Sequence, residues 1–294
     1  MNIGIVGVGR MGSAIAERLR SRGFDVIGWD HDAAANERAK VAGLRMATNA
    51  REVADASDVI ISSITEDNGA RRNFSGPDGF LLADVSGKLF IEMSTLQPMT
   101  GRELAPVVEA KGARFVEAPV LGTIPQARAG TLFAMVGGRA EDVSRARPVL
   151  EKLTRRILHM GPAGSGYAMK LAANLGLGAY VQAIAESLAL GLRQGLALDA
   201  MLEALQESAT ASPWLKAKAG VLRGEYAEMT LDIRTLRKDI MSVVTTGALT
   251  GVPTPLASGA LAALSAAAAT DYGGRDIAEL PQFFRQAMLQ NFPD

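Results

Sequence analysis

The first thirty residues place a glycine-rich turn between an expected strand and an expected helix, and this arrangement constrains the fold more than any other part of the chain. An apolar run at residues 2–6 leads into GVGRMG, in which Gly7, Gly9 and Gly12 follow the pattern G-x-G-x-x-G. An amphipathic helical segment follows, and a second apolar run ends at Asp30. Glycines at this spacing allow a tight turn and let a pyrophosphate approach the N-terminus of the helix. The pattern therefore predicts a dinucleotide-binding βαβ unit.

The acidic residue at the end of the second strand indicates which dinucleotide is bound. Asp30 can accept hydrogen bonds from the adenosine ribose hydroxyls. A 2′-phosphate at the same place would meet the like charges of Asp30 and Asp32. We therefore expect NAD, with NADP as the alternative because His31 and Arg38 add positive charge nearby. His31 is expected as a loop residue near the adenosine, and Arg10 either contacts the pyrophosphate or is a solvated loop residue.

The pattern of the chain changes at about residue 160. Before this point short apolar runs alternate with helical segments, which indicates βαβ units and a mostly parallel sheet. After the Gly- and Pro-rich stretch MGPAGSG, the sequence is rich in Ala and Leu and predicts helices only. We predict a dinucleotide-binding domain at 1–162 and an all-helical domain at 163–294, joined by a long interdomain helix. Besides residues 2–6, strands are expected at 25–30, 59–63, 89–93, 114–117 and 132–136.

Composition and charge exclude several classes of protein. Lys+Arg and Asp+Glu number 31 each, so no net charge attracts nucleic acid or a membrane surface. The chain has no cysteine, which excludes disulfides and thiol catalysis, and only two histidines, which leaves no multi-histidine metal site. No uninterrupted apolar run reaches about 18 residues, and no leader pattern precedes the first strand. We expect a cytoplasmic protein with a small-molecule substrate and without metal, nucleic-acid or membrane partners.

Four separated stretches carry a more specific pattern. They are GIVGVGRMGSAIAERL, with Met11 inside the glycine turn, IEMSTLQPMTGRELA, VEAPVLGTIPQARAGTLFAMVGG and GPAGSGYAMKLAANL. With LRKDI at 236–240, they resemble the β-hydroxyacid dehydrogenase family, which includes 3-hydroxyisobutyrate dehydrogenases, tartronate semialdehyde reductases and glyoxylate/succinic semialdehyde reductases. The resemblance implies a Rossmann-type N-terminal domain, like the NAD-binding domain of 6-phosphogluconate dehydrogenase, and an all-α C-terminal domain.

The resemblance also implies an activity and a set of site residues. The activity is hydride transfer between a nicotinamide and a small β-hydroxyacid, semialdehyde or 2-oxo acid. Lys170 is then the general acid or base, because the step needs a group for the hydroxyl proton and no histidine is placed for it. Asn174, one helical turn on, either binds a substrate oxygen or makes a helix–helix hydrogen bond. Ser94 is assigned to the substrate, Thr95 to the cofactor or to a helix N-cap, and Lys238 to the cofactor or to a solvated ion pair.

One residue departs from the family pattern. Leu121 stands where the substrate segment usually has serine, whereas Gly122 and Thr123 are retained. The backbone N–H groups of Gly122 and Thr123 are expected to bind the substrate carboxylate. A bulky apolar side chain in place of a hydroxyl predicts a more apolar or differently shaped substrate pocket.

Two other interpretations stay open. Imine reductases resemble the family throughout but usually carry another residue at the position of Lys170, and the departure at Leu121 leaves C=N reduction as an alternative. A redox-inert dinucleotide-binding or assembly module is the other alternative; it would be expected to lose the lysine, so the retention of Lys170 and Asn174 argues against it. In either case the Ala- and Leu-rich helices, such as residues 256–269, predict a homodimer or homotetramer assembled through the helical domain.

Overall fold

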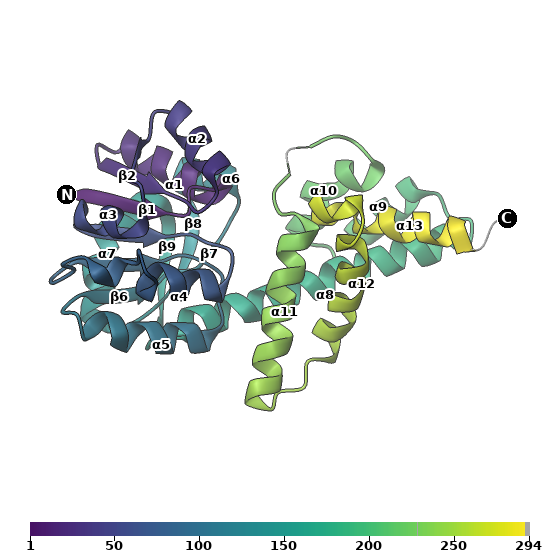
Figure 1. Cartoon of the computed structure of the whole chain (residues 1–294). Helices are drawn as coiled ribbons and strands as arrows, with labels where there is room; N and C mark the ends of the chain where they lie inside the picture. The colour runs from purple at the N-terminus through teal and green to yellow at the C-terminus, as the bar shows by residue number, and fades with distance from the viewer. Residues whose placement is uncertain (228, 292–294) are drawn as a thin grey trace. The chain divides into compact units, whose positions relative to one another are not determined.

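The computed structural model describes residues 1–227 and 229–291, and within these residues the chain forms two units, Met1–Ala172 and Ala173–Asp294. The described part of the first unit contains one nine-stranded sheet in the order β3-β2-β1-β4-β5-β6-β8-β7, with β9 paired to β8 (Figure 1). The strands are β1 (Asn2–Val6), β2 (Asp25–Trp29), β3 (Arg45–Met46), β4 (Val59–Ser62), β5 (Leu89–Glu92), β6 (Arg114–Glu117), β7 (Val120–Leu121), β8 (Leu132–Gly137) and β9 (Thr154–Gly161).

The sheet is mostly parallel, as the alternating sequence pattern predicts. Strands β1 to β6 run parallel, β8 runs antiparallel to β6 and β7, and β9 runs parallel to β8. All six strands expected from the sequence are present. The strands β3 and β7 were not expected because two residues carry no periodicity. The strand β9 was not expected because this edge strand, TRRILHMG, exposes its charged residues and lacks an apolar run.

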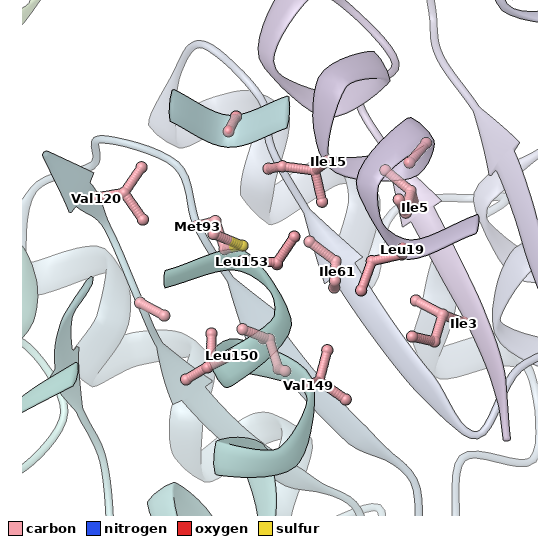
Figure 2. Packing of buried hydrophobic residues seen from close by; sticks show 14 of the residues in the cluster. Ile3, Ile5, Ile15, Leu19, Ile61, Met93, Val120, Val149, Leu150 and Leu153 are labelled. Atoms are coloured by element: carbon pink, nitrogen blue, oxygen red, sulfur yellow. The ribbon is translucent and has the colours of Figure 1, made fainter. Parts of the chain in front are cut away.

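Helices cover both faces of the sheet. Helices α1, α6 and α7 pack on one face, where Ile15 and Leu19 of α1 and Leu150 of α7 meet Ile5 and Ile61 of the sheet (Figure 2). Helices α3, α4 and α5 pack on the other face with a cluster of phenylalanines. Each of these buried side chains stabilises the fold by about 1.5–3 kcal/mol. The helices are α1 (Arg10–Ser21), α2 (Ala33–Val41), α3 (Ala50–Asp55), α4 (Asp67–Ser75), α5 (Pro98–Glu109), α6 (Ile124–Ala129) and α7 (Ala140–Leu153), with the 3-10 turn η1 (Phe80–Leu82).

The connections place a ligand site at one edge of the sheet. Strand β1 lies between β2 and β4. The helix that follows β1 packs on one face, and the helix that follows β4 packs on the other. The loops after β1 and β4 therefore run to opposite faces of the sheet at the carboxyl ends of these strands. Open α/β sheets bind their ligands at such a place.

The second unit is built of helices, as predicted. Helix α8 (Ser165–Arg193) begins in the first unit and ends in the second, so the division between the units falls within it. The predicted boundary after residue 162 lies just before this helix. Ile184 and Leu188 of α8, Leu202 of α9 and Leu215 of α10 share a hydrophobic core. The other elements are α9 (Leu198–Glu207), α10 (Pro213–Arg223), α11 (Ile233–Thr250), α12 (Pro255–Ala268), α13 (Leu280–Asn291), η2 (Asp271–Gly274) and η3 (Ile277–Glu279).

Helix α8 is also unusually apolar. Among the described residues it is the one helix whose length and composition would suffice to cross a membrane. Only 39% of its most apolar window is buried within the structure. A large part of this apolar helix is therefore not buried by the residues that the structure describes.

Candidate active site

The glycine turn has the geometry that a dinucleotide pyrophosphate requires. Gly7 has a φ of +92°, and a Cβ there would collide with the carbonyl oxygen of Ser63. A Cβ at Gly12 would collide with the carbonyl oxygen of Gly7. Gly9 is the N-cap of α1, with no side-chain hydrogen bond, and a Cβ there would meet nothing within 4 Å. The turn therefore leaves room beside Gly9 at the N-terminus of α1, and these residues fit a bound pyrophosphate.

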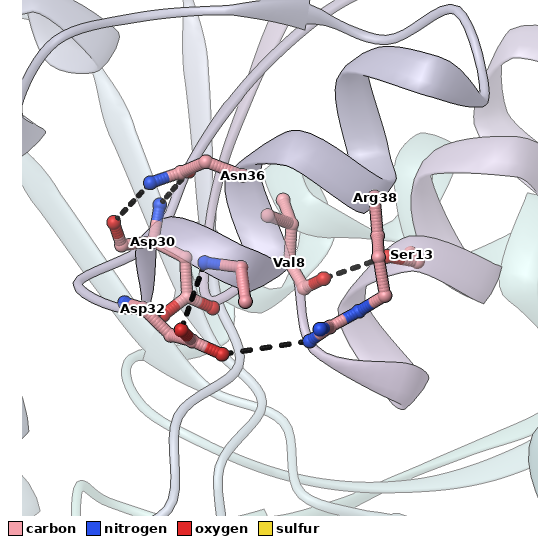
Figure 3. Close-up of polar contacts among 7 residues, drawn as sticks. Val8, Ser13, Asp30, Asp32, Asn36 and Arg38 are labelled. Carbon is pink, nitrogen blue, oxygen red and sulfur yellow. Dashed lines mark hydrogen bonds and ion pairs between the residues drawn. The ribbon is translucent and has the colours of Figure 1, made fainter.

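The side chains next to the glycines support the turn. The Ser13 hydroxyl donates to the carbonyl oxygen of Val8 at 2.7 Å, which joins the turn to α1 (Figure 3). Met11 is half-buried and packs against the hydrophobic core. Arg10 is exposed at the first residue of α1, and its side chain makes a polar or electrostatic contact within the chain.

Asp30 lies directly after β2 in a loop fixed by hydrogen bonds (Figure 3). Its backbone N–H donates to Asn36 Oδ1 at 2.8 Å, and Asn36 Nδ2 donates to its carbonyl oxygen at 2.7 Å. The N–H of Asp32 donates to Asp30 Oδ1 at 2.9 Å. Arg38 lies 3.5 Å from Asp32 Oδ2. The half-buried Asp30 carboxylate is thus held through Oδ1, and the charge of Arg38 lies beside Asp32. The contact of Asp30 with a ribose stays a prediction.

His31 occupies the loop position that was expected for it. It is exposed, its ring centroid lies 4.5 Å from that of Trp29, and its Nε2 lies 3.2 Å from Asn73 Oδ1. These residues border a cavity of about 180 Å³, which Asn49 and Arg72 also line. Trp29 and Asn73 were not predicted from the sequence to lie here. Trp29 could have been noticed because it directly precedes Asp30, whereas Asn73 carries no motif.

Ser94 joins the turns that follow β4 and β5. Its hydroxyl donates to Glu92 Oε1 in a short hydrogen bond, its N–H donates to the same oxygen at 2.9 Å, and the hydroxyl accepts from the N–H of Ile64 at 2.8 Å. The Ser94 proton is therefore committed to a protein carboxyl, and its assignment to the substrate stays a prediction. Thr95 is half-buried beside it. The N-cap of α5 is Gln97, so Thr95 does not cap this helix.

Glu92 is a buried acid that the sequence analysis missed. It is the last residue of β5 and is fully buried. Burial raises its pKa to about 7, although interactions with the Ser62 hydroxyl and with the hydroxyl and N–H of Ser94 lower it. Among the described residues, its Oε2 has no hydrogen-bond partner. The available signal was an acidic residue at the end of the buried run LFIE.

The segment from Leu121 to Thr123 forms the turn after the short strand β7. Leu121 is half-buried and pairs with Phe133 of β8. Gly122 is exposed with a φ of +137°. The N–H and hydroxyl of Thr123 lie 2.8 and 3.2 Å from Gln126 Oε1, to which both donate. The Thr123 N–H, which was expected to bind a substrate carboxylate, donates to a side chain of α6 in this structure. The binding of a carboxylate by the N–H groups of Gly122 and Thr123 stays a prediction.

Lys170 and Asn174 lie one turn apart on α8. Lys170 is half-buried within the first unit. Asn174 is buried in the second unit, where its Nδ2 donates to Asp239 Oδ2 of α11 at 2.7 Å. Lys238 Nζ lies 2.6 Å from Asp239 Oδ1. The sequence left open whether Asn174 makes a helix–helix hydrogen bond and whether Lys238 forms an ion pair, and the structure contains both interactions. The roles of these two residues toward ligands stay predictions.

The predicted site residues divide between the two units. The first unit brings the glycine turn, the residues after β2 and β5, and the segment after β7 to carboxyl ends of strands of one sheet. It also contains Lys170. Asn174 and Lys238 belong to the second unit. Among the described residues, no cluster of three or more His, Cys, Asp or Glu side chains could hold a metal ion.

Two protein-family descriptions match this chain in succession. Residues 2–161 match the NAD binding domain of 6-phosphogluconate dehydrogenase. Residues 164–284 match the family described as NAD-binding of NADP-dependent 3-hydroxyisobutyrate dehydrogenase.

Curated relatives and solved structures match nearly the whole chain. The 3-hydroxyisobutyrate dehydrogenase of Pseudomonas aeruginosa is 34% identical, over 97% of this chain and 98% of its own. The 2-(hydroxymethyl)glutarate dehydrogenase of Eubacterium barkeri is 32% identical, over 97% of this chain and 95% of its own. The structure of Mycobacterium tuberculosis 3-hydroxyisobutyrate dehydrogenase with L-serine is similar with a TM-score of 0.85 at 28% identity, over 97% of this chain and 99% of its own.

Imine reductases are more distant. The imine reductase from Myxococcus stipitatus in complex with NADP+ has a TM-score of 0.65 at 18% identity, over 96% of this chain and 99% of its own. At this level of identity the likeness shows a shared fold alone.

Proposed function

This chain belongs to the β-hydroxyacid dehydrogenase family and is an NAD(P)-dependent hydroxyacid dehydrogenase, and we propose that Lys170 is its general acid and base. The observation that carries the proposal is the place of Lys170. It is half-buried near the start of α8, in the same unit as the glycine turn and Asp30. A lysine in such a position can exchange a proton with a substrate while its stem packs on apolar surface.

The chemistry follows from this assignment. When bound, NAD(P) supplies the acceptor or the donor of the hydride. In the oxidation, the neutral Lys170 amine takes the hydroxyl proton while the carbon–oxygen bond becomes a carbonyl. In the reduction, the Lys170 ammonium returns that proton to the carbonyl oxygen. General acid–base catalysis of this kind contributes about 10²–10⁴-fold to the rate.

The loop after β2 supports NAD as the preferred cofactor. The Asp30 carboxylate is held so that one oxygen can accept from a ribose hydroxyl. Arg38, which could otherwise neutralise a 2′-phosphate, lies against Asp32. A 2′-phosphate would therefore meet two carboxylates, of which only one has a cationic partner.

Leu121 supports a substrate with an apolar substituent. It ends β7, beside the exposed Gly122, in the segment that resembles the family's substrate segment. A leucine cannot hydrogen-bond a polar substituent, and a polar group placed against it would lose its water. We therefore expect a small β-hydroxyacid with an alkyl branch to be a better substrate than one with a charged amine.

Lys170→Ala tests the catalytic assignment. Turnover is followed by the absorbance of the reduced nicotinamide, with 3-hydroxyisobutyrate, 2-(hydroxymethyl)glutarate and L-serine as substrates. We expect kcat to fall by about 10²–10⁴-fold with little change in the Kd of the cofactor. The control is Lys111→Ala, which removes an exposed lysine of the same unit at the loop before β6. Near-normal turnover in Lys170→Ala would refute the assignment.

The same panel tests the substrate class. We expect a higher kcat/KM for 3-hydroxyisobutyrate than for L-serine, and Leu121→Ser should lower this ratio by about 10-fold, the scale of one apolar group in a pocket. An unchanged ratio would remove Leu121 from the substrate pocket. Turnover of cyclic imines without turnover of hydroxyacids would instead support the imine reductase alternative.

We further propose that the chain self-associates through its helical part. Only 39% of the most apolar window of α8 is buried by the chain itself. Leu249, Val252 and Leu256, at the junction of α11 and α12, are all more than half exposed. A second copy of the chain would cover such surface in a homodimer or homotetramer.

A further inference from the structure

A buried glutamate at the end of β6 binds the start of α8. Glu117 is fully buried, and both of its carboxylate oxygens accept from backbone groups of this helix and of the residue before it. Oε2 accepts from the N–H of Gly164 at 2.9 Å. Oε1 accepts from the N–H of Gly166 at 2.6 Å and from that of Tyr167 at 3.4 Å. These are N–H groups that a helix leaves without partners at its start.

The surroundings of Glu117 are shaped to admit this carboxylate. A Cβ at Gly101 of α5 or at Gly137 of β8 would collide with its oxygens. A Cβ at Gly166 would lie 3.2 Å from Oε1. Three different elements thus present glycine to the same carboxylate. This arrangement leaves little room for either the glutamate or the start of the helix to move.

The ionisable groups around Glu117 include Arg102 of α5 and Glu92, its register partner on β5. Burial raises its pKa to about 7, while the N–H groups of Gly164, Gly166 and Tyr167 and the charge of Arg102 on α5 lower it. The Tyr167 ring, also fully buried, lies against the same place on α5. The ionised form suits the start of a helix because it meets the positive end of the helix dipole.

The position of this contact along α8 links it to Lys170. Lys170 follows Gly166 by one helical turn, so the two residues lie on the same side of the helix. Both belong to the first unit. Because a helix is stiff over one turn, fixing the N–H of Gly166 fixes the rotation of α8 and the direction in which Lys170 leaves it.

We propose that Glu117 is a positioning residue, which holds the first turn of α8 on the end of β6 and so sets the place from which Lys170 reaches the substrate. The inference rests on the proposed role of Lys170. Glu117 itself does not contact the substrate, because it is covered on all sides by protein. Its effect on the reaction therefore passes through the helix.

Glu117→Gln tests the proposal because it keeps the shape of the side chain but removes one of the two acceptors. The amide NH2 then faces an N–H group of α8 instead of accepting from it. The matched control is Asp142→Asn, which neutralises another buried carboxylate of the same unit; this one accepts from Arg139 at 2.9 Å and, among the described residues, has no hydrogen bond to α8. If Glu117→Gln does not fold, Glu117→Asp withdraws the carboxylate by one methylene and serves the same comparison.

The first measurement is amide hydrogen exchange of the protein without cofactor. We expect the amides of residues 164–170 to exchange about 10-fold faster in Glu117→Gln, and at the wild-type rate in Asp142→Asn. The second is kinetics. We expect kcat of Glu117→Gln to fall by about 10–100-fold with the KM of the cofactor unchanged, because displacing a catalytic group by about 1 Å has an effect of this size.

The outcomes separate this proposal from the proposed function. Unchanged exchange at residues 164–170 would show that Glu117 does not hold the helix. Faster exchange with an unchanged kcat would show that it holds the helix without positioning Lys170. Either result overturns the proposal. If Lys170→Ala keeps normal turnover, the proposed function fails and this positioning role fails with it, whereas the exchange data alone still report whether Glu117 binds α8.

Discussion

Asp30 shows how a single residue is fixed by its neighbours at the place where the sequence predicts a ribose contact. The side chain of Asn36 binds both the N–H and the carbonyl oxygen of Asp30, so the backbone there is fixed before any cofactor arrives. The carboxylate accepts one N–H from within its own loop. Such preorganisation lowers the entropy that a bound ribose would otherwise cost.

Asp30→Ala should therefore change cofactor selection. Losing a hydrogen bond to a charged group costs about 1.5–3 kcal/mol, so we expect the Kd of NAD to rise by about 10–100-fold. The Kd of NADP should rise less, or fall, because a carboxylate that repels the 2′-phosphate is removed. Titration calorimetry with both cofactors measures the two values.

The control for this experiment is Asp25→Ala, at the opposite end of the same strand. Asp25 is exposed and lies 3.6 Å from Arg45, so it has the same charge but no place in the loop after β2. We expect its cofactor affinities to equal those of the wild type. An unchanged Kd of NAD in Asp30→Ala would refute the ribose role of Asp30.

The residues whose local geometry could be predicted from the sequence are those whose signal is local. Gly7, Gly12 and Asp30 lie within one βαβ unit, and their spacing alone implies their geometry. The partners of the other site residues lie far along the chain. Ser94 binds the N–H of Ile64, and Glu117 binds Gly166 across 49 residues of sequence. Such contacts follow from strand order and register, which a single sequence does not specify.

At the scale of elements, the ends of β5 and β6 place two buried acids side by side. Glu92 and Glu117 are register partners on these neighbouring parallel strands. Their side chains therefore leave the sheet on the same face, and Tyr167 of α8 interacts electrostatically with both. The strands themselves were predictable from their apolar runs. The pairing of their last residues was not.

Glu92→Gln should remove part of the pH dependence of stability. The pKa of this group is raised from 4.5 to about 7 by burial. The folded state therefore holds the proton over an interval in which the unfolded chain has lost it. The stability that Glu92 contributes is complete below about pH 4.5 and is lost as the pH rises through about 7.

Chemical denaturation near pH 5 and near pH 8 measures this effect. Each pKa unit corresponds to about 1.4 kcal/mol, and about 1.8 pKa units take effect between these two pH values. The free energy of unfolding of the wild type should therefore fall by about 2.5 kcal/mol more than that of Glu92→Gln over this interval. The groups facing Glu92 are Ser62, Ser94, Asp67, Tyr167 and its register partner Glu117. Glu117 titrates in both proteins, so its own contribution is largely common to the two. Equal pH dependence in the two proteins would contradict the raised pKa.

At the scale of the whole molecule, the change of pattern near residue 160 correctly predicted a sheet-based part followed by a helical part. The division of the structure falls inside α8, after Ala172. The sequence could not indicate that the division lies inside this helix, because a continuous helix shows no break in its periodicity. The homodimer or homotetramer expected from composition stays a prediction, and the exposed apolar residues of the helical part make it testable.

Leu249→Glu combined with Leu256→Glu should break the proposed self-association. These side chains are 67% and 68% exposed at the end of α11 and the start of α12. Each leucine buried between two copies would contribute about 1.5–3 kcal/mol, and a glutamate in its place would bring an unpaired charge into the contact. We expect light scattering after size exclusion to give a multiple of 30.9 kDa for the wild type and 30.9 kDa for the double variant. The matched control is Val41→Glu, which changes a residue 82% exposed at the end of α2 and should leave the mass unchanged. A wild-type mass of 30.9 kDa would refute self-association, and a double variant that keeps the wild-type mass would place the contact elsewhere on the chain.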